Sequence, residues 1–235
     1  MINRPNFDQL LKELKDEALE FSKNYPGTII SYQLLGSPLM FSNTLLLGIE
    51  WEESIGLHTQ EEMPLVNEIL VHPNNNTYNG YLQFFSGLLD NDLTKIVEYF
   101  NSIIFSNGCL FKTPKDDAHY KDIFKEGYAR SKRFIQDIID QTGVQNIICF
   151  NNEASYTARI VGEILFDIDN FWLFFDGITE DLASGHNTMQ FEGKGRYDNI
   201  TAYCFPNVNE LKIWDLEMMD NPVYQNLKER SGSFN

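Results

Sequence analysis

The sequence predicts an α/β fold, a three-layer α/β/α sandwich with a mainly parallel central sheet between two layers of helices. Strand-like and helix-like segments alternate along the chain with short connections, which is typical of parallel sheets with crossover helices. Residues 44–49 form an apolar run without polar alternation, which suits a strand covered on both faces. A chain of 235 residues can bury one large core, so we expect a single domain over residues 1–235.

Helices are predicted where apolar residues recur at helical spacing. Phe7, Leu10 and Leu14 follow this spacing in residues 7–23, and Pro26 and Gly27 end that segment. The other predicted helices span residues 79–89, 91–101, 121–142, about 153–165 and about 220–230. We expect Asp90 or Asn91 to cap the helix over 91–101, and Gly143 to end the helix over 121–142.

Strands are predicted by short apolar runs between these helices. They cover residues 44–49, 102–107, 145–150, 171–175 and 200–205. Residues 176–199, with four glycines, are predicted to form a long loop, and loops of this length are often functional lids. Residues 231–235 are expected to form a loose tail.

The chain is strongly acidic, with a formal net charge of −16. Such a charge repels phosphate over roughly 8 Å at physiological salt, which argues against nonspecific binding to duplex DNA. It is also the charge that keeps many cytosolic proteins soluble. One modest group of basic residues, expected to be balanced by nearby acids, consists of Lys112, Lys115, Arg130, Lys132 and Arg133.

The three cysteines, Cys109, Cys149 and Cys204, lie in or beside apolar strand-like segments. We interpret them as buried free thiols of a reducing compartment, because their spacing matches no metal motif. We therefore expect no metal and no cofactor. The chain has no secretory signal pattern and no apolar run near the ~20 residues of a membrane span, so we expect a cytoplasmic protein without a membrane partner.

The strand over residues 44–49 ends in a polar loop that is the first candidate site. In open α/β sheets, ligands bind just beyond the carboxyl ends of the strands. The residues that follow this strand, Glu50, Trp51, Glu52, Glu53 and Ser54, are therefore placed to contact a ligand.

Four strand ends carry polar or glycine-containing motifs in a particular order. They read Gly-Ile-Glu-Trp at 48–51, Ser-Asn-Gly-Cys at 106–109, Phe-Asn-Asn-Glu at 150–153 and Phe-Pro-Asn-Val at 205–208. In this order the chain resembles the uracil-DNA glycosylase superfamily over roughly residues 40–215. In that family, a Gly-x-Asp/Asn-Pro loop orients the attacking water and a later strand-terminal Asn binds the flipped base. A final His-Pro-Ser-Pro loop contacts the base and wedges into the duplex.

The resemblance implies a role for each matching residue. Glu50 takes the water-activating position after Gly48, and Trp51 stands where the family has proline. Asn107 matches the base-binding asparagine. The substrate-binding candidates are thus Gly48, Trp51, Asn107, Phe205, Pro206 and Asn207. Phe205 replaces the family's histidine, so the usual stabiliser of the leaving base is missing.

The chemistry of these side chains fits base excision, although each also has a purely structural interpretation. A carboxylate such as Glu50 can stabilise an oxocarbenium-like sugar and take the proton of the attacking water, or it can simply be solvated. Asn107 offers both a donor and an acceptor to a base edge, or it can cap a turn. Trp51 can stack on a base, or pack in the core.

Candidate phosphate contacts are Ser54 and the glycine-flanked pair Lys194 and Arg196, which can equally form a lid turn without a ligand. Our first hypothesis is a divergent DNA glycosylase acting on single-stranded or locally opened DNA. The alternative is a catalytically degenerate acidic protein on the same scaffold that mimics DNA or inhibits a basic, nucleic-acid-binding partner. A third possibility keeps the chemistry but acts on a free nucleoside or nucleotide.

Overall fold

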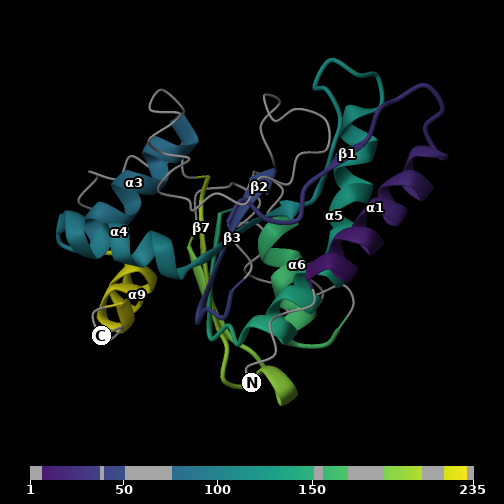
Figure 1. Cartoon of the computed structure of the whole chain (residues 1–235). Helices are drawn as coiled ribbons and strands as arrows, with labels where there is room; N and C mark the ends of the chain where they lie inside the picture. The colour runs from purple at the N-terminus through teal and green to yellow at the C-terminus, as the bar shows by residue number, and fades with distance from the viewer. Residues whose placement is uncertain are drawn as a thin grey trace.

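The computed structural model describes residues 7–37, 40–50, 76–150, 156–168, 188–207 and 220–231 (Figure 1). Outside these ranges lie the predicted strand over 171–175 and four candidates of the first site, Trp51, Glu52, Glu53 and Ser54. So do residues 232–235 of the predicted tail.

A five-stranded sheet forms the centre of the molecule, in the order β3-β2-β5-β7-β6. Four strands are parallel: β2 (Thr44–Glu50), β3 (Ile104–Cys109), β5 (Asn146–Phe150) and β7 (Thr201–Phe205). The fifth, β6 (Met189–Glu192), is an antiparallel edge strand. The predicted α/β fold with a mainly parallel sheet is thereby confirmed.

Helices cover both faces of the sheet. One face carries α1 (Phe7–Ser22), α5 (Tyr120–Thr142) and α6 (Tyr156–Leu165). The other carries α3 (Asn76–Leu88), α4 (Leu93–Ser102) and α9 (Pro222–Ser231). Figure 1 shows the two groups on opposite sides of the strands, so the chain builds three layers.

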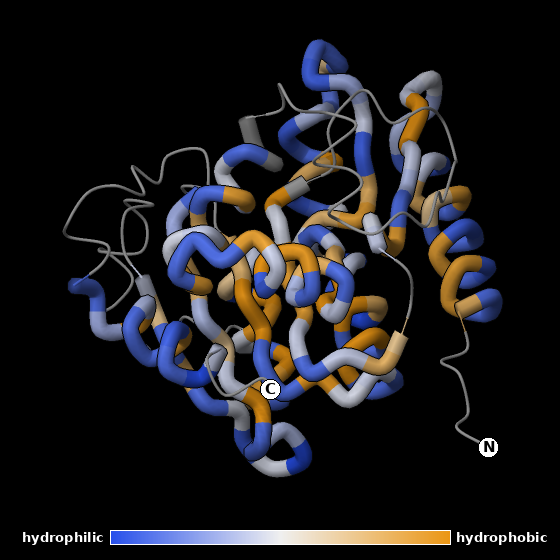
Figure 2. The backbone as a smooth tube through the Cα atoms, turned by 60° about the vertical axis from the view of Figure 1, so that its left-hand side comes forward, coloured by the Kyte–Doolittle hydropathy of each residue, from blue (hydrophilic) through white to orange (hydrophobic). Residues whose placement is uncertain are grey.

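Each face of the sheet has its own core, because successive strand residues point to opposite faces. Leu45 and Leu47 belong to the core under α1, α5 and α6, whereas Leu46 belongs to the core under α3, α4 and α9. The second core is the richer in aromatic rings. Phe84 lies at its centre, with ring centroids 4.9–5.4 Å from four aromatic neighbours. In Figure 2 the hydrophobic stretches gather in the interior and the hydrophilic ones on the outer turns.

Two short elements join the main sheet at its margins. β1 (Ser31–Tyr32) and β4 (Phe111–Lys112) form a two-stranded antiparallel sheet. A 3-10 turn, η2 (Gly195–Tyr197), follows β6. The hydrogen bonds from Gln33 N to Leu110 O and from Gly36 N to Phe105 O tie the segment around β1 to the edge of β3.

Several local predictions were wrong at the level of single residues. The N-cap of α4 is Asp92, whose carboxylate accepts hydrogen bonds from the amides of Thr94 and Lys95. Asp90 and Asn91, predicted as caps, instead adopt positive φ angles of 55° and 59° in the turn after α3. Both residue types tolerate this left-handed conformation better than most.

The C-terminal half of the chain holds further differences. Residues 189–192 of the predicted long loop form β6. Ser231, predicted to be in the loose tail, is the last residue of α9 and is buried. Gly143 ends α5 as predicted, with a φ of +78°.

Candidate functional site

The topology singles out the carboxyl end of β2. The next strand along the chain, β3, lies on one side of β2, and the chain then returns to place β5 on the other side of β2. β2 therefore lies where the strand order reverses, and doubly wound sheets bind ligands in the crevice outside the strand ends at that point. Glu50 is the last residue of β2, in register with Cys109 of β3.

A buried amide lies just below this strand end. Asn107 pairs with Gly48 across β2 and β3, and only 3% of its surface is exposed. Its Oδ1 lies 2.1 Å from the point where a Cβ on residue 48 would stand, and the Tyr81 hydroxyl lies 2.7 Å from that point. The amide and the phenol thus converge on the Cα of Gly48, and only glycine leaves room for both.

Asn107 is placed differently from its sequence prediction. It was expected to end its strand, but β3 continues through Gly108 to Cys109. Because both residues are buried and Cys109 pairs with Glu50 of β2, the strand does not turn at the polar residue. Asn107 therefore lies within β3, beside Gly48 and below the end of β2, and not in a loop.

Two hydroxyl groups hold the end of β2 from the opposite face. The Tyr128 hydroxyl of α5 donates to the carbonyl of Ile49 at 2.8 Å, and Thr157 Oγ1 of α6 donates to the carbonyl of Gly48 at 3.5 Å. The two hydroxyl oxygens lie 3.2 Å apart. A Cβ on Gly108 would stand 2.6 Å from both side chains, so this second glycine permits their close approach.

Sequence reasoning missed Tyr128 and Thr157 as residues that position the site. Both lie on helices that are distant in sequence from β2. The available signal was the pair of glycines inside neighbouring apolar strands, because glycine in a strand often marks a close approach.

The residues of the final predicted loop contribute mainly to the core. Phe205 ends β7 and is fully buried, with its ring centroid 4.9 Å from that of Phe84 and 6.1 Å from that of Phe150. Pro206 is buried, and Asn207 is half-buried. The aromatic core therefore accounts for Phe205, whereas Asn207 remains accessible at the carboxyl edge.

The basic pair Lys194 and Arg196 does not join this site. β6 runs antiparallel to β7, and Glu192 pairs with Thr201, the first residue of β7. Residues 193–197 consequently leave the sheet at its amino edge, opposite the end of β2. There Lys194 Nζ lies 4.9 Å from the ring centroid of Phe166, and Arg196 forms an ion pair with Asp140 at 3.4 Å.

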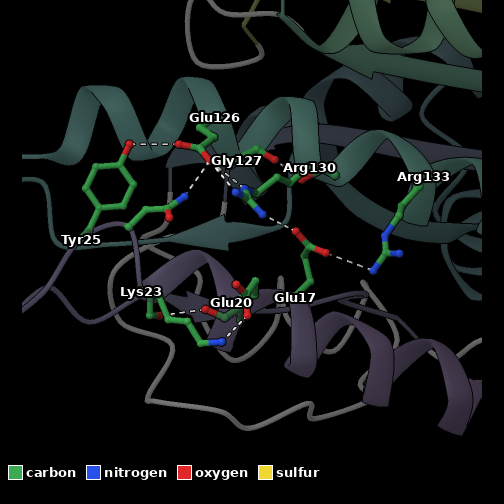
Figure 3. Close-up of polar contacts among 12 residues, drawn as sticks. Glu17, Glu20, Lys23, Tyr25, Glu126, Gly127, Arg130 and Arg133 are labelled. Carbon is green, nitrogen blue, oxygen red and sulfur yellow. Dashed lines mark hydrogen bonds and ion pairs between the residues drawn. The ribbon is translucent and has the colours of Figure 1, made fainter.

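The basic residues of α5 are balanced by acids, as predicted. Arg130 contacts both Glu126 and Glu17, and Arg133 reaches Glu17 at 3.2 Å (Figure 3). Lys132 pairs with Glu163 at 3.3 Å. These guanidinium and ammonium groups are therefore engaged within the protein, and this part of α5 offers no surplus positive charge to phosphates.

The segments attached to the carboxyl edge are acidic in sequence. Residues 51–75, 151–155 and 208–219, which follow β2, β5 and β7, together contain nine Asp or Glu residues and one Lys. The connections that follow three of the four parallel strands are thus acidic in composition.

Comparisons with known proteins do not indicate a family or a function for this chain. No protein-family model matches the chain, and no curated protein is significantly similar to it. Within the ranges that the structure describes, no helix is long and apolar enough to cross a membrane. Those same ranges contain no group of three or more His, Cys, Asp or Glu residues suited to a metal ion.

Proposed function

We propose that this chain is a divergent DNA glycosylase-like hydrolase, which cleaves the N-glycosidic bond of a flipped, deaminated or modified base. The position of Glu50 supports this proposal most directly. It is a carboxylate-bearing residue at the end of the switch-point strand, two positions beyond Gly48, whose register partner is Asn107. A carboxylate and an amide on adjacent strands are the two groups that hydrolysis and base recognition require.

Each group has a distinct role in the proposed reaction. Departure of the base leaves an oxocarbenium-like sugar, which the Glu50 carboxylate stabilises while taking the proton of the attacking water. The Asn107 amide supplies a donor and an acceptor to the edge of the base. Its burial beside Gly48 and Tyr81 fixes its position before the substrate arrives, which lowers the cost of reorganisation.

The charge distribution favours single-stranded or locally opened DNA as the substrate. Binding to duplex DNA draws much of its affinity from several Lys or Arg side chains that neutralise phosphates. Arg130, Lys132 and Arg133 are instead paired with acids. A base that is already unpaired also avoids the unstacking cost of a few kcal/mol.

The first test measures alkali-labile sites in a single-stranded oligonucleotide that contains uracil. We expect the unmodified protein to cut this substrate and Glu50→Gln to lose activity at least about 100-fold, the usual contribution of a general base. Glu98→Gln is the matched control, because Glu98 is an exposed residue of α4. Equal cutting by Glu50→Gln, or no cutting of any deaminated or modified base, would refute the proposed activity.

A second candidate function rests on the acidic sequence of the segments that follow the strand ends. The nine acids in the segments after β2, β5 and β7 favour a protein that mimics DNA and binds a basic, nucleic-acid-binding partner. A salt titration separates the two functions. An enzyme should bind a single-stranded oligonucleotide. A DNA mimic should instead bind a lysine-rich peptide, release it as the salt concentration rises, and not bind the oligonucleotide. Release of base from deoxyuridine alone would indicate a nucleoside substrate.

A further inference from the structure

Two cysteines face each other in the centre of the sheet. Cys149 of β5 and Cys204 of β7 are register partners on adjacent parallel strands, and both are fully buried. Their Sγ atoms lie 2.6 Å apart. The side chains thus turn toward each other, and neither has a role in the proposed activity.

The backbone geometry permits a covalent bond between them. Adjacent strands lie about 4.7–4.9 Å apart, and disulfides join Cα atoms that are about 4.4–6.8 Å apart. Both residues belong to the core under α1, α5 and α6, so their side chains project from the same face of the sheet. The two sulfurs are already in contact, so the pair can bond without a shift of either strand.

Cys109 provides an internal comparison. It is as deeply buried as the other two cysteines, but its Sγ contacts the carbonyl oxygens of Phe111 at 3.1 Å and Phe124 at 3.8 Å. Both of these hydrogen-bond acceptors are backbone groups. Burial alone does not distinguish the Cys149–Cys204 pair, whereas the contact between the two sulfurs does.

We propose that Cys149 and Cys204 form a dithiol that closes to an intrachain disulfide across the ends of β5 and β7. With oxidised glutathione as the co-reactant, one cysteine thiolate attacks a glutathione sulfur and releases one glutathione thiolate. The second cysteine thiolate then attacks the sulfur of the first, which forms the protein S–S bond and releases the other glutathione. Two electrons pass to glutathione, and the two cysteine protons end on the released thiols.

The bond would lie next to the candidate site. Cys149 and Cys204 each precede the last residue of their strand, Phe150 and Phe205, and Cys149 also pairs with Leu47 of β2. Closure would fix the spacing of the two strand ends beside the switch point. It would also close a covalent loop between positions 55 residues apart, which restricts the unfolded chain.

Burial controls how fast the pair reacts. Removal from water, together with the neighbouring Cys204 thiol, raises the pKa of Cys149 well above its usual range, so the thiolate is scarce in the folded protein. Glutathione also needs an opening of the sheet to reach the sulfurs. We therefore expect slow oxidation of the folded chain and faster oxidation during refolding.

The test refolds the full chain from denaturant in a buffer of reduced and oxidised glutathione, and then alkylates the remaining thiols. We expect two of the three cysteines to escape alkylation, with a mass loss of two hydrogens and a cross-linked peptide that joins residues 149 and 204. Cys109→Ala should keep the cross-link, and Cys149→Ala should abolish it. The oxidised protein should melt about 5–10 °C higher than the reduced one.

Three outcomes would overturn the proposal. The first is a chain that keeps three alkylatable thiols at every glutathione ratio. The second is a cross-link that involves Cys109, which would mean that pairing follows chance in the unfolded chain. The third is the same mass loss in Cys149→Ala. If that variant fails to refold, Cys204→Ser takes its place, and the same mass loss in Cys204→Ser would equally overturn the proposal.

Discussion

Gly48→Ala tests the geometry of the candidate site, because the close approach of Asn107 depends on the missing side chain. Gly48 lies within the regular strand β2, so its backbone accepts alanine. The new methyl group would stand 2.1 Å from Asn107 Oδ1 and 2.7 Å from the Tyr81 hydroxyl, whereas ordinary contacts begin near 3.4 Å. The amide must therefore move by more than an ångström, although only 3% of the surface of Asn107 is exposed.

The expected cost of Gly48→Ala is that of overpacking a core, about 1–3 kcal/mol in the free energy of unfolding. Alanine also restricts the unfolded chain more than glycine does, which stabilises the folded protein by about 0.4–1 kcal/mol. The net loss in the free energy of unfolding is then about 1–2 kcal/mol. Urea unfolding followed by far-UV circular dichroism should then show a midpoint lower by about 0.5–1 M, with an unchanged slope.

The double variant Gly48→Ala/Asn107→Ala is the control, because it removes the atom that clashes most closely. We expect the two substitutions to couple, with the pair about 1 kcal/mol more stable than the sum of the single effects predicts. An unchanged midpoint for Gly48→Ala, or additive effects in the double variant, would mean that Asn107 does not lie over Gly48 in solution.

Two further predictions concern the helix layer around α5. Burial and the hydrogen bond to Asp140 raise the pKa of Tyr197 to about 12. An unfolded tyrosine ionises near pH 10, so the stability that this raised pKa contributes is complete below pH 10 and is lost as the pH rises through about 12. The melting temperature should fall less steeply over this pH interval in Tyr197→Phe than in the unmodified protein. Parallel plots of melting temperature against pH would mean that Tyr197 does not cause the loss of stability. Glu17→Gln should lower the free energy of unfolding by about 0.5–1.5 kcal/mol, because it weakens the contacts with Arg130 and Arg133 that join α1 to α5 (Figure 3). Glu20→Gln is its control, because Glu20 forms an exposed pair with Lys23, and it should change stability by less than about 0.5 kcal/mol. Equal urea midpoints for Glu17→Gln and Glu20→Gln would refute the larger role of Glu17.

The main elements could be predicted because their signals are local. The apolar run at 44–49 and the helical periodicity before Gly143 both report burial directly, and both gave the correct element. The strand β6 was missed because its four residues alternate between buried and half-exposed or exposed positions and lie in a glycine-containing stretch. A strand this short gains its stability from pairing with β7, which the sequence does not show.

The candidate site could be predicted only in part, since its assembly depends on strand direction and register. The sequence indicates that Glu50 and Asn107 follow or lie in buried strands, and parallel pairing brings those strands together. It does not indicate that Lys194 and Arg196 leave the sheet at the other edge, because one antiparallel strand reverses the direction of the chain. Nor does it indicate the hydroxyls of Tyr128 and Thr157, whose contacts with β2 arise from helix packing.

The unequal chemistry of the two cores makes each layer separately observable. All three cysteines lie in the core under α1, α5 and α6, so the rate of thiol alkylation reports the opening of that layer. Leu46 and Ile148 lie among the rings of the other core, so their methyl groups should give NMR signals shifted by ring currents. Followed together through one urea titration, thiols and methyls would reveal whether the two sides of the sheet come apart in one step or in two.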